Sequence, residues 1–141
     1  MPQPLRLLIV DDDALHAEVL AVGLGAEEGV EVVGVAADGR EALRLAVRRL
    51  PDVVLMDVQM PHLDGIEATR RLQYLVPSAR VVVLSGSLVV DDVARALAAG
   101  AAAWVPKGRP YEEVLAAVRD AVRDQPPISR SLFALRRLEP A

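Results

Sequence analysis

The sequence predicts a doubly wound α/β fold, in which a parallel sheet of five strands is covered by five helices. Short β-branched runs alternate with longer segments of helical period, which is the pattern of repeated βα units. Hydrophobic residues make up 52% of the chain but aromatic residues only 3%, so the core must be built from Val, Leu and Ala. A length of 141 residues fits one compact domain with a short extension.

Five apolar runs have the length and the β-branched content of buried strands. They cover residues 5–10, 31–36, 53–56, 80–84 and 102–105. Helices fill the intervals, and residues that begin or end helices stand at most of the expected boundaries. The expected starts are Asp13, Asp38, Asp64, Asp91 with Asp92, and Pro110, and the expected ends are Gly25 or Gly29, Pro51, Pro77 and Gly100. The first helix is predicted over 14–24 and the fifth over 112–123.

Two helices carry a recognisable apolar face. The second is expected to turn Ala42, Leu43 and residues 45–47 inward, and the third carries Ile66, Leu72 and Leu75. Beyond the fifth helix, Pro126-Pro127 breaks the chain, so we expect a main domain over 1–124 and a linker or tail helix over 125–141. One stripe of this tail holds Ile128, Leu132, Leu135 and Leu138. So short a helix is marginal alone, and we expect it to pack on the main domain and to support a weak homodimer.

Composition and charge exclude several classes of function. The net charge of −4 argues against a broad basic surface for nucleic acid, so DNA binding would need another domain. The absence of cysteine excludes disulfides, thiolate metal sites and a cysteine nucleophile, and fits a reducing cytoplasm. The run over residues 7–10 is too short for a signal sequence or a membrane span. We therefore expect a soluble cytoplasmic protein.

Four carboxylates and a lysine stand where predicted strands end, at residues 11–13, Asp57 and Lys107. Parallel strands gather their carboxyl ends at one edge of the sheet, so these groups are expected to meet in one cleft. Carboxylates this close resist ionising together, and a hard divalent cation with oxygen ligands relieves their repulsion. A lysine can neutralise a phosphoryl group. The cleft is therefore predicted to be a magnesium and phosphoryl site.

Each member of this set has an expected role. Asp57 can act as a nucleophile toward phosphorus and form an acyl phosphate. At least one of Asp11 and Asp12 should bind Mg²⁺ directly, and the other through water. Ser85 can donate its hydroxyl to a phosphoryl oxygen, and Gly86 leaves room for that oxygen.

Other polar residues are expected to be structural. Helix capping and solvated faces account for Asp13, Asp38, Asp64, Asp91 and Asp92. His16 and His62 have no partners at metal-ligand spacing and are assigned to the surface. Gly23-x-Gly25 lacks a third glycine, so a dinucleotide site is not predicted.

The chain resembles the receiver domain of two-component response regulators over about residues 4–124. The resemblance rests on IVDD at 9–12, MDVQMPHLDG at 56–65, VLSG at 83–86 and WVPK at 104–107. It implies a flavodoxin-like fold, with Asp57 as the phosphoacceptor and Lys107 as the lysine that contacts the phosphoryl group. It also implies that Asp12 and the backbone carbonyl of Gln59 ligate the metal beside Asp57, that Asp11 is the second acidic residue, and that Ser85 is the switch hydroxyl.

The resemblance also implies partners. A sensor histidine kinase would donate the phosphoryl group, and no turnover of an external substrate is expected. The order of segments looks most like the subfamily with a C-terminal LuxR/NarL-type helix-turn-helix, which implies control of transcription through DNA binding by a domain outside this chain. Phosphorylation is expected to strengthen a homodimer.

Two positions depart from the family pattern. Trp104, three residues before Lys107, replaces the usual Tyr or Phe whose inward movement reports phosphorylation. Gly108 follows Lys107 where many members have a proline in a cis bond, and a cis bond before glycine is intrinsically costly.

Two other interpretations remain open. One is a haloacid-dehalogenase-like phosphatase with Asp11 as nucleophile and Asp13 as its partner, although Leu15 stands where that motif has Thr or Val. The other is a pseudo-receiver that binds partners without phosphate.

Overall fold

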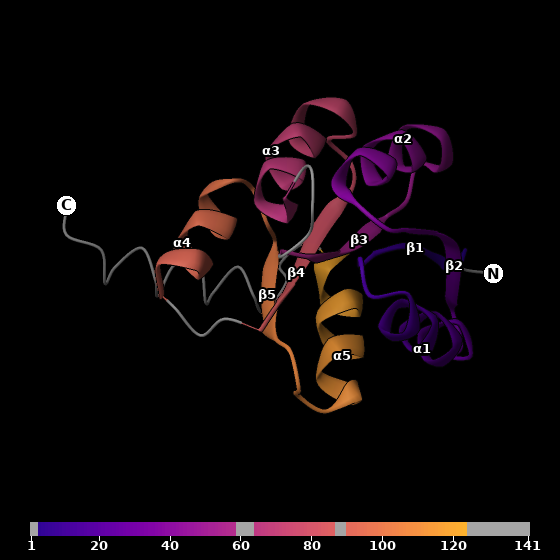
Figure 1. Ribbon diagram of the computed structural model, residues 1–141. Helices are drawn as coiled ribbons and strands as arrows, with labels where there is room; N and C mark the ends of the chain where they lie inside the picture. Colours follow the sequence, from indigo (N-terminus) through magenta and orange to yellow (C-terminus); the bar gives the residue numbers. More distant parts are fainter. Residues whose placement is uncertain (1–2, 59–63, 87–89, 124–141) are drawn as a thin grey trace.

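The computed structural model describes residues 3–58, 64–86 and 90–123, and it shows the predicted parallel sheet in the order β2-β1-β3-β4-β5 (Figure 1). The strands are β1 Leu5–Val10, β2 Val30–Ala36, β3 Val53–Asp57, β4 Arg80–Ser85 and β5 Ala103–Pro106. The helices are α1 Ala14–Gly25, α2 Gly39–Arg49, α3 Gly65–Leu75, α4 Val90–Ala98 and α5 Tyr111–Ala121. The doubly wound α/β fold is therefore confirmed.

Helices cover both faces of the sheet. One buried cluster joins the strands to α1 and α5, and a second joins them to α2, α3 and α4 (Figure 1). Successive strand residues point to opposite faces, so Leu7 and Ile9 enter the first cluster while Leu8 and Val10 enter the second. Both faces of β1 and β3 are thus buried under helices, and solvent reaches these strands only at their ends.

Most element boundaries differ from the predicted ones by one or two residues. The fifth strand was expected at 102–105 and lies at Ala103–Pro106, and α5 ends at Ala121. The prediction for the inward face of the second helix is wrong at Val47, whose side chain is half exposed. Gly39, Ala42 and Ala46 are the buried positions of α2, since a spacing of three and four residues places them on one side of the helix.

The predicted capping role is confirmed for the aspartates before α1, α2 and α3. Asp13 accepts from the backbone N–H groups of Leu15 and His16 at 3.1 and 3.2 Å. Asp38 and Asp64 cap α2 and α3 in the same way. These caps satisfy helix N–H groups that otherwise have no partner within the helix.

Gly23 has a packing role that the sequence did not reveal. The Tyr111 hydroxyl donates to the Gly23 carbonyl oxygen at 2.6 Å and ties α5 to α1. A Cβ at Gly23 would lie 3.0 Å from the Tyr111 ring, so glycine allows this approach. Burial, followed by the charge of Glu27, raises the pKa of the Tyr111 phenol.

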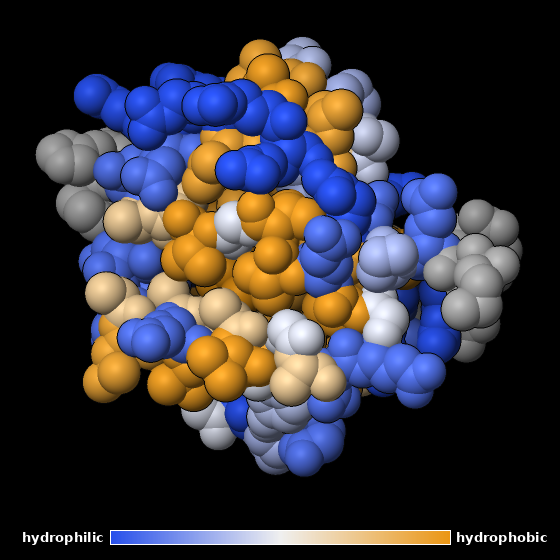
Figure 2. All heavy atoms as spheres, turned by 90° about the vertical axis from the view of Figure 1, so that its right-hand side faces the viewer, coloured by the Kyte–Doolittle hydropathy of each residue, from blue (hydrophilic) through white to orange (hydrophobic). Residues whose placement is uncertain are grey.

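The first helix is apolar on both sides. Ala17, Leu20 and Leu24 are buried against the sheet, while Leu15, Val19 and Val22 are 72%, 61% and 69% exposed. Figure 2 faces the β2 side of the molecule and shows hydrophobic side chains across the centre and lower part of that face. A helix that is apolar all round is usually covered on both sides. None of the helices in the described part of the chain is long and apolar enough to cross a membrane.

Candidate functional site

The structure brings three of the predicted site carboxylates together at the carboxyl ends of neighbouring strands. Asp11 and Asp12 directly follow β1, and Asp57 is the last residue of β3, which pairs with β1. One oxygen from each carboxylate lies within 4.8 Å of the others. Asp11 and Asp57 are buried and Asp12 is exposed, so the cluster opens to solvent on the Asp12 side.

The strand order explains why the cluster forms at this point. After β1 the chain runs to β2 on one side of β1, and then returns to β3 on the other side. Connections that leave in opposite directions open a crevice outside the strand ends, which is where open α/β sheets bind ligands. Asp11, Asp12 and Asp57 flank this crevice.

Lys107 reaches the cluster from the edge of the sheet. It follows β5, and its side chain passes β4 to place Nζ 3.0 Å from Oδ2 of Asp57. Its backbone N–H donates to the Ser85 carbonyl oxygen at 2.8 Å, which fixes the start of the side chain. Ser85 is buried at the end of β4, where it pairs with Pro106 and follows Leu84, the strand partner of Asp57. The predicted basic and hydroxyl groups therefore lie at the same edge as the carboxylates.

The backbone just after Asp57 is held by β4 and by the start of α3. The N–H of Val58 donates to Leu84 O at 3.2 Å, and the N–H of Gly65 donates to Val58 O at 3.0 Å. A Cβ at Gly65 would lie 2.1 Å from the carbonyl oxygen of Asp57, so no other residue fits without moving the strand end. The sequence marked the Asp64-Gly65 pair as a helix start and as part of the family motif, but this close contact was not foreseen.

His16, which the sequence assigned to the surface, is 38% exposed at its side chain and also contacts the site. Its Nδ1 contacts Oδ2 of Asp11, while Oδ1 of Asp11 accepts from the N–H of Asp13 at 2.9 Å. The Asp13 cap sets α1 directly above the end of β1, and side chains in a helix lean toward its N-terminus. The signal in the sequence was a histidine in the first turn of the helix that follows the acidic pair.

Trp104 lies in β5 and packs, partly buried, against the cluster on the α2–α3–α4 side. Its indole Nε1 is buried and has no acceptor among the described residues. The described residues contain no cis peptide bond, and Gly108 has a φ of 87°, a region that favours glycine.

Several predicted residues lie outside the described ranges. Gln59, His62 and the tail over 125–141 are among them, as is the side chain of Asp91. That the backbone carbonyl of Gln59 ligates the metal therefore stays a prediction.

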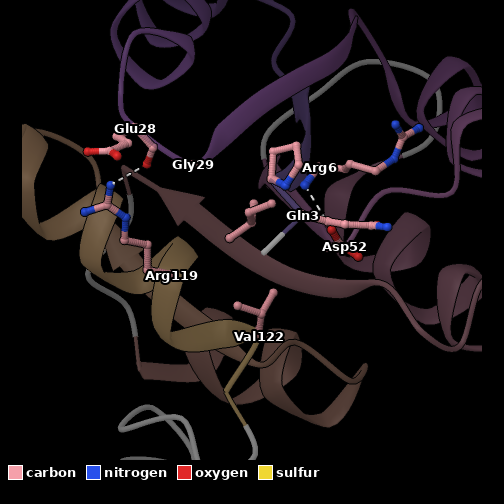
Figure 3. Close-up of a pocket in the computed structure, with 9 residues that line it drawn as sticks. Gln3, Arg6, Glu28, Gly29, Asp52, Arg119 and Val122 are labelled. Carbon is pink, nitrogen blue, oxygen red and sulfur yellow. Dashed lines mark hydrogen bonds between the residues drawn. The ribbon is translucent and has the colours of Figure 1, made fainter. Parts of the chain in front are cut away.

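A second concavity lies at the opposite edge of the sheet (Figure 3). This hollow of about 930 Å³ is lined by residues that include Arg6, Asp52 and Arg119. Three of its charged side chains have neighbouring partners. The Asp52 carboxylate accepts from the backbone N–H of Arg6 at 2.9 Å, and the guanidinium groups of Arg6 and Arg119 donate to the backbone carbonyls of Arg49 and Glu28. It lies beside the starts of the strands, away from the carboxylate cluster.

The donor set at the strand ends fits a divalent cation. Carboxylate oxygens are ligands that Mg²⁺ prefers, and an exposed Asp12 leaves room for the waters that Mg²⁺ retains. Asp11, Asp12 and Asp57 are the described residues that would hold it.

A parallel sheet in the order β2-β1-β3-β4-β5, with an acidic cluster and a lysine at its carboxyl edge, defines a receiver-like α/β domain. The family model of the response regulator receiver domain matches residues 7–119, and the chain belongs to this family.

Known relatives agree with this assignment. The chain is 39% identical to the response regulator GacA of Pseudomonas aeruginosa over 139 residues, which cover 96% of this chain and 65% of that protein. It is 43% identical to a protein-glutamate methylesterase/protein-glutamine glutaminase of Geobacter metallireducens over 116 residues, covering 77% of this chain and 33% of that protein. The signal receiver domain of the putative response regulator NarL from Mycobacterium tuberculosis has a TM-score of 0.83 and 34% identity, covering 88% of this chain and 100% of that one.

The curated relatives are longer than the chain. Its match spans 58% of LiaR of Bacillus subtilis, a transcriptional regulatory protein that is 37% identical over 122 residues. The chain thus corresponds to the receiver part of longer proteins, and the rest of these proteins differs from one to another.

Proposed function

We propose that Asp57 accepts a phosphoryl group from a sensor histidine kinase, with Mg²⁺, and that this modification switches partner binding. The observation that carries the proposal is the position of Asp57 at the end of β3. It is buried, it lies within 4.8 Å of Asp11 and Asp12 oxygens, and Lys107 Nζ is 3.0 Å away. A cytoplasmic location is part of the proposal, because kinases that use ATP work there.

The residues support an in-line transfer. A carboxylate oxygen of Asp57 forms a bond to phosphorus, while the P–N bond to the donor imidazole breaks and its electron pair stays on nitrogen. Lys107, whose Nζ lies 3.0 Å from Oδ2 of Asp57, would contact the phosphoryl oxygens, and the hydroxyl of Ser85 would donate to one of them. Mg²⁺, held by Asp11, Asp12 and Asp57 and by the proposed Gln59 carbonyl, would supply positive charge to the transferring group.

Identifying the labelled aspartate tests this proposal. Incubation with phosphoramidate and Mg²⁺ should add one phosphoryl mass, and peptide mapping should place it on Asp57. Asp57→Asn should abolish labelling, whereas Asp38→Asn should retain it, because Asn replaces Asp equally well at a helix N-cap. A label on Asp11 would instead favour the phosphatase interpretation, and no label on any residue would favour a pseudo-receiver.

Trp104 gives an optical measure of the switch, because it is the only tryptophan in the chain. The indole is partly buried against the cluster on the α2–α3–α4 side, so a rearrangement on phosphorylation would change its surroundings. Beryllofluoride and Mg²⁺ should therefore change its fluorescence. Asp57→Asn should not respond. Unchanged fluorescence at full occupancy, measured by calorimetry, would show that the switch does not act through Trp104.

The proposed output is control of transcription through a DNA-binding domain outside this chain. Support comes from similarity to LiaR, named as a transcriptional regulatory protein, and to GacA. Other relatives are named as methylesterases and not as transcriptional regulators. If the gene of this chain encoded a methylesterase domain after the receiver domain, the proposed output would be contradicted.

We further propose a weak homodimer that phosphorylation strengthens. Leu15, Val19 and Val22 form an exposed apolar stripe on α1. A second copy of the chain or the tail over 125–141 could pack on this stripe. Sedimentation with beryllofluoride should show association of the full chain, and less association when the chain ends at Asp124 or carries Val19→Glu. Monomers in every sample would contradict the dimer.

A further inference from the structure

We propose that the α1 stripe, formed by Leu15, Val19 and Val22, is the docking surface for the tail of the same chain, residues 125–141. The inference rests on the proposed use of this stripe for packing, and it commits that surface to one occupant in the unphosphorylated monomer. It does not depend on phosphorylation of Asp57. Three observations carry it: the apolar pattern of the two segments, their opposite charge, and the place where the chain leaves α5.

The α1 stripe faces away from the sheet. Its three residues are each more than half exposed, and their spacing of four and three residues places them on one side of the helix. The opposite side of α1 is buried against the sheet. Apolar side chains that are exposed together, rather than singly, usually mark a surface that another segment covers.

The surroundings of the α1 stripe are acidic. Residues 7–39, which run from β1 to the start of α2, contain eight carboxylates and neither lysine nor arginine. Glu18 is the neighbour of Val19 on α1 and is exposed, and so is Glu28 just beyond the end of the helix. A complementary partner for this surface therefore combines an apolar stripe with basic side chains.

The tail has this combination in its sequence. Ile128, Leu132, Leu135 and Leu138 recur at spacings of four, three and three residues, which places them on one side of a helix. The same tail holds three arginines and one glutamate. At about 1.5 Å per residue, its apolar stripe would be about 15 Å long and would cover the α1 stripe, which is about 10 Å long.

The chain enters the tail beside α1. Arg119, in the last turn of α5, donates to the carbonyl oxygen of Glu28 at 3.0 Å, so the end of α5 lies next to the end of α1 (Figure 3). Residues 124–127 can span about 13 Å when extended. Packed helices lie about 8–10 Å apart, so Ile128 can reach the α1 stripe of its own chain.

The short connection also explains why the tail of the same chain is the occupant. It keeps the tail close to the α1 stripe at every protein concentration, whereas the tail of a second copy must be bound from solution. Exchange of tails between two copies would form the same contacts in both directions. The proposed homodimer could then use the surface that is covered in the monomer.

A spin label on the tail tests the contact in the full chain. The chain has no cysteine, so Ser129→Cys provides a single attachment site, and residue 129 lies off the apolar stripe of the tail. A nitroxide at this site should broaden the NMR amide signals of α1. The signals of α3 should keep their intensity, because α3 covers the other face of the sheet.

Two variants show whether the α1 stripe makes the contact. Val19→Glu should abolish the broadening of the α1 signals, because it places a carboxylate in the apolar contact. Val47→Glu is the matched control, since Val47 is a half-exposed valine on α2, which packs on the face of the sheet opposite α1. This variant should leave the broadening unchanged.

A mixture of spin-labelled chains and isotope-enriched chains without the label identifies the copy that the tail contacts. In dilute solution the enriched chains should show no broadening. Broadening of their α1 signals as strong as within one chain would overturn the proposal, because the occupant would then be the tail of a second copy. So would a labelled chain without broadening in α1, or broadening that persists in Val19→Glu. None of these outcomes bears on phosphoryl labelling of Asp57, which tests the proposed function separately.

Discussion

Gly65→Ala should destabilise the fold by about 2–3 kcal/mol, although alanine is the better helix former by about 1 kcal/mol. The added Cβ would lie 2.1 Å from the carbonyl oxygen of Asp57 and 2.8 Å from Cα of Val58. Both are backbone atoms of the strand end, and cannot turn away as a flexible side chain can. The end of β3 would have to move, and with it the carboxylate of Asp57.

Urea denaturation measures the effect. Gly25→Ala is the matched control, because it also lies in a helix and its Cβ would meet only a Val32 methyl at 3.5 Å, an ordinary contact. That variant should be as stable as the wild type or slightly more stable. If Gly65→Ala unfolds at the wild-type urea concentration, the close packing of α3 on Asp57 is not maintained in solution.

Residues with strong local signals were predicted well. Valine-rich runs identified the strands, and aspartates identified the starts of α1, α2 and α3. Strand ends depend on neighbouring strands, which the local pattern does not contain. Asp57 is included in β3 because it pairs with Leu84, and Pro106 in β5 because it pairs with Ser85.

Long-range contacts account for what the sequence did not reveal. His16 was assigned to the surface because it has no partner at metal-ligand spacing, whereas the residue that its ring contacts, Asp11, follows the end of β1. The face of α2 was misjudged at Val47 because small residues, Gly39, Ala42 and Ala46, allow closer packing on the sheet than larger ones. The acidic cluster was predictable because parallel strands must end at a common edge, whatever the details of their packing.

Mg²⁺ should stabilise the unphosphorylated protein. Asp11, Asp12 and Asp57 place three carboxylate oxygens within 4.8 Å of one another, and Lys107 contacts Asp57. Negative charge thus remains concentrated around Asp11 and Asp12, and a bound cation relieves this repulsion in the folded state only. At a Mg²⁺ concentration one hundred times the dissociation constant, the free energy of unfolding should rise by about 2.7 kcal/mol.

Thermal melting with and without Mg²⁺ measures this stabilisation, and Asp12→Ala decides its origin. Asp12 is the exposed member of the cluster, so its replacement should leave the core intact. Without Mg²⁺, the variant should melt at a higher temperature than the wild type because the repulsion between carboxylates is reduced. Its melting temperature should not respond to Mg²⁺. Glu18→Ala removes an exposed carboxylate from α1 outside the cluster and should respond to Mg²⁺ like the wild type. An equal rise in all three proteins would show that Mg²⁺ acts by general screening of the acidic chain, and an unchanged wild type would contradict binding at the strand ends.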